Sequence, residues 1–444
     1  MLIARHLRTS VVNQAISLPK RLGQVSACRL VSTTVSLISI GSETVQVKWH
    51  DGGTSLLDPI WLRERCQSDI TVDPATLQPR KSPHEIPKKL LVTEARLLEE
   101  GDQVQVSFSD GHVSQFSLAD LQAEVMDFRT SPIQVPDYQK PQRRLWRGST
   151  AKVPTFEYSA LMQDESVRLA LVEEVLVGGQ VLVRGVPQDD GEVVRFGQMF
   201  STLRDTNWGP VFNVRTKPDD AVKPTGSKPQ MDLAYTPSFI GFHTDNPYRW
   251  PTPDFQLLHA IDHCECPDGA APCAECQVMN YMVDGFDVAE QLRQEDPEAF
   301  RLLCEVPVRF EHNGGDNETA LVHVAPHFEL EETVQGQPSS LRAIRFSAKS
   351  GQYSPPLDLP TLRAFNRARR RFSELAHSEE NVLSLQFKPG DLLFFDNQRL
   401  LHSRSEIAPT DGERWVQGCY IDRDGLWLNY ERWRRRASPP VTNV

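Results

Sequence analysis

The sequence predicts a mainly β protein with surface helices, built as a β-sandwich or jelly roll and preceded by a smaller β-rich domain. Three observations support this prediction. Short apolar segments, alternating or continuous, recur between turn residues along most of the chain. Only a few longer stretches have helical spacing. With 444 residues, 39% of them hydrophobic, the chain is long enough for two domains with buried cores.

The first 42 residues differ from the rest of the chain. They contain no acidic residue, whereas arginines and lysines are scattered among Ser, Thr, Val and Leu. A basic, Ser-rich leader without acids is typical of a mitochondrial transit peptide, and a disordered cytosolic extension is the alternative. We therefore expect a protein of the mitochondrial matrix, or a cytoplasmic one if residues 1–42 are not a transit peptide.

Residues 44–130 are expected to form the small β-rich domain. Val45, Val47 and Trp49 alternate ahead of a His-Asp-Gly-Gly turn. Residues 104–108 alternate up to a Ser-Asp-Gly turn and are followed by a second arm through Phe116, which predicts a hairpin. The Pro-rich and polar stretch 131–154 is expected to be a linker.

Residues 155–435 are expected to form the larger domain. Residues 158–177 have helical spacing, and two glycines should end that helix before an apolar strand at 180–186. Further helices are expected at 192–203, 286–303 and 360–377. Short strands are expected at 241–243, 255–260, 277–283, 341–346, 383–387, 392–395 and 415–421. Residues 436–444 are expected to be a frayed tail.

The composition argues against two classes of protein. The formal net charge of −11 disfavours a nucleic-acid partner, because phosphate binding requires a basic face. No run of the sequence approaches the roughly 18 apolar residues that a membrane span needs. A small cationic ligand suits the negative charge better.

Two short motifs carry candidate metal ligands. His243 and Asp245 are expected at the end of a strand, where side chains two residues apart point to the same side. His402 follows an apolar strand that begins after a Lys-Pro-Gly-Asp turn. Two imidazoles and one carboxylate on one face of a metal leave the opposite face open, as in oxygen-activating Fe(II) enzymes. Arg414, on the next expected strand, can bind a carboxylate through two hydrogen bonds.

Each of these features taken alone has a simpler explanation. His-x-Asp is a common tripeptide, a histidine after an apolar strand is more often a core or surface residue, and an arginine is usually a solvated charge. The combination in this order favours an iron(II) site formed by His243, Asp245 and His402.

In these motifs and several others, the sequence resembles the γ-butyrobetaine dioxygenase and trimethyllysine dioxygenase family, within the taurine-dioxygenase-like superfamily. The resemblance covers most of residues 44–435. Besides the iron motifs, it rests on Trp61-Leu62-Arg63-Glu64-Arg65-Cys66, Ala234-Tyr235-Thr236, Gln256-Leu257-Leu258-His259, Val283-Asp284-Gly285-Phe286, Phe395-Asp396-Asn397 and Gly418-Cys419-Tyr420.

The resemblance implies a double-stranded β-helix and a dioxygenase that uses Fe(II), O2 and 2-oxoglutarate, with ascorbate as reductant. Arg414 would bind the 5-carboxylate of 2-oxoglutarate, and Leu258 would line the same site. The favoured reaction is hydroxylation of γ-butyrobetaine to L-carnitine by a homodimer. Trimethyllysine or a trimethylaminoalkyl phosphonate is an alternative substrate, and a non-catalytic jelly-roll binding protein is an alternative of another class.

The resemblance also implies an aromatic cage for a quaternary ammonium group, which is recognised through cation–π attraction. The matching positions are Trp208, Phe212, Tyr235 and Tyr420. Each aromatic taken alone is more typical of a core, whereas four at four cage positions favour the cage. Ser347 stands where the butyrobetaine enzymes present an asparagine for the substrate carboxylate, so the acid end of the substrate remains an open question.

Two cysteine-containing regions bear on zinc. The family holds zinc in its N-terminal domain through three cysteines and a histidine, but only Cys66 and His112 match here, so we expect no zinc at that position. A second group lies in a loop that contains Pro and Gly: Cys264, Cys266, Cys273 and Cys276. These four cysteines either hold one zinc ion or are free thiols on a surface loop.

Overall fold

The computed structural model describes residues 35–437 apart from 42, 51, 77, 81, 99–101, 131–141, 216–233, 235, 237, 263–277, 314–319, 332–339, 348 and 408–413. Most of the expected leader, Tyr235 and the four-cysteine loop therefore lie outside the described residues. The chain divides into two compact units, one comprising Met1–Gln139 with Thr333–Gly336 and the other Lys140–Glu332 with Gln337–Val444.

The described part of the first unit contains two three-stranded antiparallel sheets and two α-helices. One sheet consists of β1 (Val35–Ile40), β2 (Val45–Trp49) and β3 (Thr54–Leu57), and the other of β4 (Val92–Leu97), β5 (Gln103–Phe108) and β6 (Val113–Ser117). The expected hairpin is confirmed as β5–β6, with Gly111 at φ 82° in its turn. The helices are α1 (Pro59–Glu64) and α2 (Leu118–Thr130), and Pro83–Glu85 forms a 3₁₀ turn. The alternating residues of β2 point into the shared core.

The described part of the second unit contains two main sheets. The larger sheet has the order β7 (Thr155–Glu157), β8 (Gln180–Arg184), β19 (Leu392–Asp396), β11 (Phe255–Asp262), β21 (Trp415–Ile421), β9 (Phe212–Arg215). The smaller sheet has the order β10 (Ile240–His243), β20 (Leu400–Arg404), β12 (Asn280–Asp284), β18 (Leu383–Leu385). Met282 and Leu400 of the smaller sheet share one core with Leu393 and Phe395 of the larger sheet, so the two sheets pack against each other.

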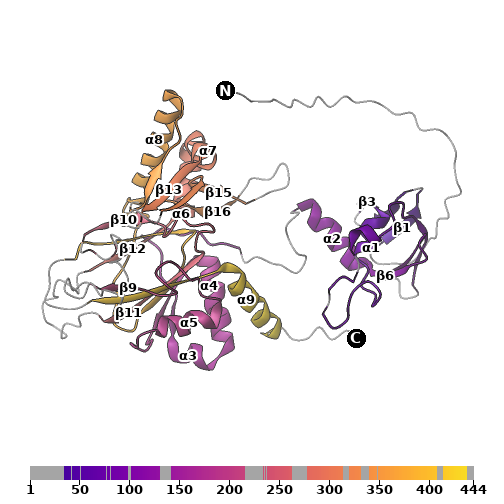
Figure 1. Cartoon of the computed structure of the whole chain (residues 1–444), viewed down its shortest axis with the longest axis horizontal. Helices are drawn as coiled ribbons and strands as arrows, with labels where there is room; N and C mark the ends of the chain where they lie inside the picture. Colours follow the sequence, from indigo (N-terminus) through magenta and orange to yellow (C-terminus); the bar gives the residue numbers. More distant parts are fainter. Residues whose placement is uncertain are drawn as a thin grey trace. The chain divides into compact units, whose positions relative to one another are not determined.

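Helices on the outer face of the larger sheet bury its second side (Figure 1). They are α3 (Tyr158–Gln163), α4 (Glu165–Gly178), α5 (Glu192–Phe200) and α9 (Arg423–Ala437). The single helix expected at 158–177 is wrong. The chain is extended at Asp164, whose side chain accepts a hydrogen bond from the Ser166 N–H and starts α4 as a new helix. Gly179, at φ 86°, ends α4 as expected.

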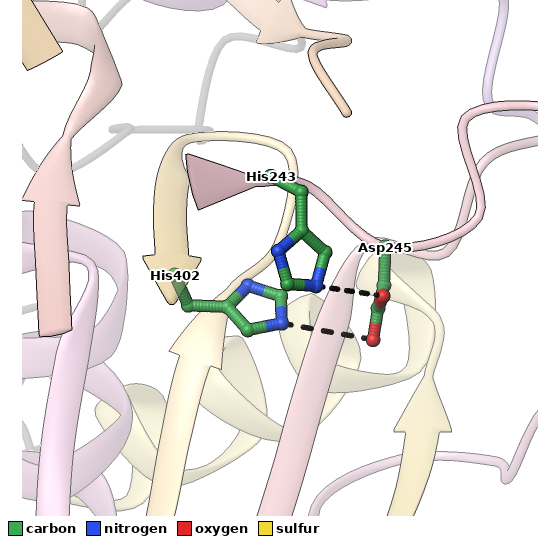
Figure 2. Close-up of side chains that lie close together, drawn as sticks. All are labelled: His243, Asp245 and His402. Atoms are coloured by element: carbon green, nitrogen blue, oxygen red, sulfur yellow. Dashed lines mark ion pairs between the residues drawn. The ribbon is translucent and has the colours of Figure 1, made fainter. Parts of the chain in front are cut away.

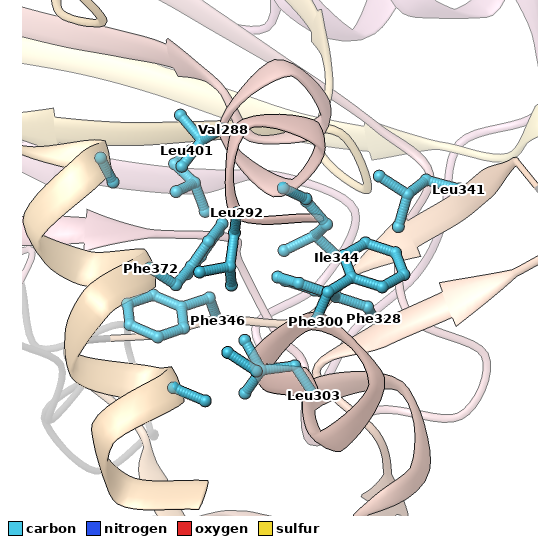
Figure 3. Packing of buried hydrophobic residues seen from close by; sticks show 14 of the residues in the cluster. Val288, Leu292, Phe300, Leu303, Phe328, Leu341, Ile344, Phe346, Phe372 and Leu401 are labelled. Carbon is cyan, nitrogen blue, oxygen red and sulfur yellow. The ribbon is translucent and has the colours of Figure 1, made fainter. Parts of the chain in front are cut away.

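A second group of helices lies beside the smaller sheet: α6 (Gly285–Glu295), α7 (Pro297–Glu305) and α8 (Leu359–Ala376). They share a core with the strands β13 (Val308–Asn313), β15 (Phe328–Leu330) and β16 (Leu341–Ile344). Figure 3 shows the part of this core around Phe328, Leu341 and Ile344. β13 lies between β14 (Ala320–Ala325) and β17 (Gly351–Tyr353). The helix expected at 286–303 is divided, because Asp296 caps α7 and Pro297 cannot donate to α6.

The mainly β architecture with surface helices is confirmed. Each of the two packed sheets is covered by helices on its outer side, and core side chains fill the space between the sheets. No helix in the described parts of the chain has the length and apolarity needed to cross a membrane.

Candidate metal centre

His243 and His402 are brought together by strand pairing. His243 is the last residue of β10, and His402 lies opposite it in the antiparallel pair of β10 and β20. Their ring centroids are 4.1 Å apart. The chain leaves β10 and places Asp245 beside both rings, with Oδ1 3.4 Å from His243 Nε2 and Oδ2 3.7 Å from His402 Nε2 (Figure 2). One potential ligand atom from each residue lies within 4.8 Å of the others.

The backbone of Asp245 is fixed by a buried amide. Asn397, just after β19, accepts a hydrogen bond from the Asp245 N–H at 2.7 Å and donates to the Asp245 carbonyl at 3.0 Å. Thr244 is tied in the same way to Phe346, whose carbonyl accepts from the Thr244 N–H at 2.6 Å. These long-range bonds hold the irregular segment after β10 at one position.

Further hydrogen bonds orient the carboxylate of Asp245. Its Oδ2 accepts from Gln256 Nε2 at 2.9 Å and from the Tyr420 hydroxyl at 3.0 Å. Its Oδ1 lies 2.9 Å from Lys349 Nζ. Outer contacts of this kind keep a metal-binding carboxylate in place.

The protonation states suit a cation. Burial by itself raises the pKa of Asp245, but Lys349 and the two histidines hold that pKa well below its usual value, so the side chain is a carboxylate. Burial lowers the pKa of His402 to about 4, so its ring is neutral at pH 7. The Gly241 carbonyl lies 2.8 Å from His243 Nδ1 and accepts a hydrogen bond from it, so Nε2 is the nitrogen that faces Asp245. Two imidazoles and one carboxylate fit Fe(II).

A buried ion pair supports the strand that carries His402. Arg399 donates to Asp284 through Nε at 3.1 Å and Nη2 at 2.7 Å, and both side chains are almost fully buried. Arg399 also donates to two backbone carbonyls, those of Arg144 and Val177. Gly285 is required beside it, because a Cβ there would lie 2.7 Å from the Arg399 carbonyl. The Val283-Asp284-Gly285-Phe286 motif and Arg399 therefore have a structural role.

One of the two residues expected to bind 2-oxoglutarate lies on β11 of the larger sheet, and the other lies just before the neighbouring strand β21. Arg414 is buried, with 3% of its surface exposed, immediately before β21. Leu258 lies on β11 opposite Gly418 of β21, and its side chain packs against the core between the sheets. A buried guanidinium at a sheet edge suits a carboxylate ligand.

Two of the four aromatic residues expected in the cage are in contact. Phe212 on β9 and Tyr420 on β21 have ring centroids 5.3 Å apart. The Phe212 ring lies so close to Gly418 that a Cβ there would come within 2.2 Å of Phe212 Cζ. Trp208 instead packs edge-on against His312 at 5.6 Å. Tyr235 lies outside the described residues, although the carbonyls on either side of it accept hydrogen bonds from Arg404.

Sequence reasoning missed three residues that contact or orient Asp245. Gln256 and Asn397 lie within motifs that signalled the family, but nothing local shows that their side chains converge on Asp245. Lys349 lies in an irregular segment after β16 and has no motif around it.

A second cluster lies in the first unit, around Cys66. Cys66 Sγ is 3.1 Å from His112 Nε2 and 3.2 Å from Ser68 Oγ, which in turn lies 3.3 Å from Thr71 Oγ1. Burial raises the pKa of Cys66, but hydrogen bonds from Ser114, Ser68 and His112 lower it to about 6. The cluster combines one thiol and one imidazole with hydroxyls, which are poor zinc ligands.

Comparison with known proteins covers both units. The model of the taurine catabolism dioxygenase TauD, TfdA family matches residues 141–420, and the model of a γ-butyrobetaine hydroxylase-like N-terminal region matches residues 38–122. The γ-butyrobetaine dioxygenase of Pseudomonas sp. (strain AK-1) is 30% identical over 397 residues, which cover 89% of this chain and 95% of that protein. The human γ-butyrobetaine dioxygenase is 27% identical, with 89% and 96% covered.

The mouse mitochondrial trimethyllysine dioxygenase is 24% identical over 423 residues, which cover 91% of each chain. Among solved structures, the non-heme iron oxygenase OrfP in complex with Fe, succinate and (3R,4R)-dihydroxy-L-Arg has a TM-score of 0.42 and 15% identity, covering 64% of this chain and 87% of that one.

Proposed function

The chain belongs to the TauD, TfdA family of dioxygenases, which use Fe(II) and 2-oxoglutarate, and on that premise we propose that it hydroxylates a trimethylammonium compound. The favoured reaction is the conversion of γ-butyrobetaine to L-carnitine. The relatives named as γ-butyrobetaine dioxygenases, at 30% and 27% identity over nearly their whole length, support this choice. Trimethyllysine is the second candidate, because a trimethyllysine dioxygenase matches at 24% identity.

One observation carries the proposal. His243, Asp245 and His402 converge from segments far apart in the sequence, and the Phe212–Tyr420 pair is joined to them through the hydrogen bond from Tyr420 to Asp245. An aromatic surface that would recognise an ammonium group is thus joined by a hydrogen bond to a carboxylate that would bind the metal. This arrangement would place the substrate carbon next to the reacting centre.

Each group of residues has a role in the proposed reaction. His243, Asp245 and His402 would hold Fe(II), and Arg414 would hold the far carboxylate of 2-oxoglutarate in a site lined by Leu258. When bound, Fe(II) and 2-oxoglutarate supply the oxidising chemistry that puts one oxygen atom of O2 into a C–H bond of the substrate, while 2-oxoglutarate becomes succinate and CO2. Ascorbate would serve as reductant.

The protein itself supplies orientation. Gln256 and Tyr420 hold Oδ2 of Asp245, so Oδ1 keeps a fixed direction toward His243. The proposed cage consists of the Phe212 and Tyr420 rings together with Trp208 and Tyr235. The two packed sheets exclude water from the region beneath the site, which strengthens the electrostatic contacts of the ligands.

We also propose the organisation of the chain. Residues 1–42 would be a mitochondrial transit peptide, 44–130 a small β-rich domain and 155–435 the catalytic domain, a double-stranded β-helix that functions as a homodimer. The mouse relative is a mitochondrial trimethyllysine dioxygenase, which supports the first of these assignments. Residues 1–42 fused to a reporter should direct import into mitochondria, and a diffuse cytosolic signal would contradict the assignment.

A turnover screen tests the substrate. The full-length protein, with Fe(II), 2-oxoglutarate and ascorbate, is incubated with γ-butyrobetaine, trimethyllysine or a trimethylaminoalkyl phosphonate, and the hydroxylated product is measured by mass spectrometry. We expect the highest kcat/KM for γ-butyrobetaine. The matched control is the isostere in which carbon replaces the quaternary nitrogen, because it fills the same volume without the charge. Equal turnover of the isostere would refute cation recognition.

A further inference from the structure

Lys349 forms an ion pair with one of the three expected metal ligands. Its Nζ lies 2.9 Å from Asp245 Oδ1, and only 10% of its side chain is exposed. The other oxygen, Oδ2, already accepts hydrogen bonds from Gln256 and Tyr420. Oδ1 is therefore the oxygen with capacity for a cation, and Lys349 lies against it.

The segment that carries Lys349 is tied to the metal ligands. The Phe346 N–H donates to Thr244 Oγ1 at 3.2 Å, and the Thr244 N–H donates to the Phe346 carbonyl. Ser347 is fully buried, and its Oγ accepts from the N–H groups of Lys349 and Ser350 at 3.3 and 3.1 Å. Ser347 thus stabilises its own turn, and Lys349 is the residue of this segment that reaches Asp245.

A divalent metal and an ammonium group compete for the same carboxylate oxygen. Asp245 carries one negative charge, and the site is buried, so the repulsion between two cations at Oδ1 is strong. Binding of Fe(II) at Asp245 requires Lys349 to move away from Oδ1. A largely buried ammonium that has lost its carboxylate partner then favours an anionic group nearby.

We infer that Lys349 exchanges partners: it pairs with Asp245 when the metal is absent, and it binds the anionic end of the substrate when the metal is present. The second half of this inference rests on the proposed function and deepens it. Tyr420 donates to Oδ2 of Asp245 and packs against Phe212, whereas Lys349 contacts Oδ1 of the same carboxylate. A substrate with an ammonium group at one end and an acid at the other would then lie between the aromatic pair and Lys349, with its middle carbons near the metal.

The first half of the inference, that Lys349 pairs with Asp245 when the metal is absent, is tested by measuring metal affinity in the absence of turnover. Co(II) is titrated into full-length wild type and into Lys349→Met by calorimetry, in the absence of 2-oxoglutarate and substrate. The variant should bind Co(II) at least about tenfold more tightly, because no ammonium has to be displaced. Lys152→Met, which alters an exposed lysine, should bind Co(II) as wild type does. Tighter binding cannot result from misfolding, and an unchanged or weaker affinity of Lys349→Met would overturn the inference.

The second half is tested by comparing γ-butyrobetaine with its carboxamide, which keeps the cation and lacks the acid. Lys349→Met should lower kcat/KM for the acid by roughly 30-fold and leave the carboxamide within about threefold, so the preference for the acid disappears. Lys349→Arg should retain part of that preference. Equal losses for both compounds would refute the role in substrate binding.

Failure of the proposed function has a different signature. If wild type hydroxylates neither the acid nor the carboxamide, then the trimethylammonium assignment is wrong, and the role of Lys349 at the substrate is wrong with it. The Co(II) titration still decides whether Lys349 competes for Asp245, because that measurement needs no substrate.

Discussion

The two units each bring polar side chains to one point, but only one set has the chemistry of a metal site. In the second unit, His243, Asp245 and His402 present two imidazoles and a carboxylate. In the first unit, Cys66 and His112 meet the hydroxyls of Ser68 and Thr71.

In both clusters the course of the backbone brings side chains from separate parts of the sequence close together. We therefore expect donor identity, rather than proximity, to decide whether such a cluster binds a metal.

The largest expected effect is loss of the carboxylate from the metal centre. Asp245→Ala removes one of three ligands and should lower Fe(II)-dependent succinate release at least about a thousandfold. His402→Ala should behave in the same way. The control is Asp189→Ala, which removes an exposed carboxylate and should leave turnover unchanged. Near-normal turnover by Asp245→Ala, with a circular dichroism spectrum like that of wild type, would show that the ligands are misassigned.

Adding metal ligands to the Cys66 cluster should create a metal site in the first unit. Ser68→Cys combined with Thr71→Cys supplies two thiolates beside Cys66 and His112, and should raise zinc affinity at least about a thousandfold over wild type. The measurement is competition for zinc with a coloured chelator. The control pair Thr76→Cys with Ser82→Cys adds two thiols at exposed positions and should not show this gain. If the two double variants bound zinc with equal affinity, donor identity would not explain the difference between the two units.

The Cys66 cluster should also make the stability of the first unit depend on pH. The pKa of Cys66 is about 6 in the folded chain, below the ordinary value of 9.0, so the thiolate contributes stability that is complete above pH 9 and is lost as the pH falls through 6. The loss between pH 9 and pH 6 should be at most about 3 kcal/mol, because solvent screens part of the stabilisation.

Hydrogen exchange of the β5–β6 amides in the full chain, corrected for the intrinsic effect of pH, measures this loss. Cys66→Ala should remove the pH dependence, and a variant with the same profile as wild type would exclude the thiolate as its cause.

The smallest expected effects separate the two roles of Tyr420. Tyr420→Phe removes the hydroxyl that donates to Asp245 and should weaken Co(II) binding about tenfold with little change in substrate KM. Phe212→Leu removes only a ring face and should raise substrate KM up to roughly 30-fold while Co(II) affinity stays unchanged. If both variants change only Co(II) affinity, or both change only substrate KM, then Tyr420 does not link the cage to the metal ligands.

Local pattern was sufficient to predict the mainly β fold and to select residues that the structure brings together. His243 and Asp245 were recognisable from the His-x-Asp spacing, but the expected strand alternation does not place both: β10 ends at His243, and Asp245 is held by its hydrogen bonds with Asn397. The strand containing His402 was not predicted, since β20 follows β19 after a short turn and its pairing with β10 depends on contacts far along the chain.

Other features depend on tertiary contacts that leave no local signal. Tyr420 was expected only as a cage residue, but its hydroxyl reaches from β21 of the larger sheet to Asp245, which follows β10 of the smaller sheet. Lys349 lies in irregular chain whose position is set by the Thr244–Phe346 hydrogen bonds. Side-chain capping at Asp164 and Asp296, together with Pro297, divided two helices whose apolar periodicity continued through the break.

The most direct test of the difference between the two clusters is the X-ray absorption spectrum of Fe(II) in the full-length protein, loaded anaerobically with one equivalent. If the metal lies at His243, Asp245 and His402, the first shell contains only nitrogen and oxygen, with outer-shell scattering from two imidazole rings, and Asp245→Ala changes the spectrum. A sulfur ligand in the first shell, or a spectrum that Asp245→Ala leaves unchanged, would contradict the assignment of the metal to this site.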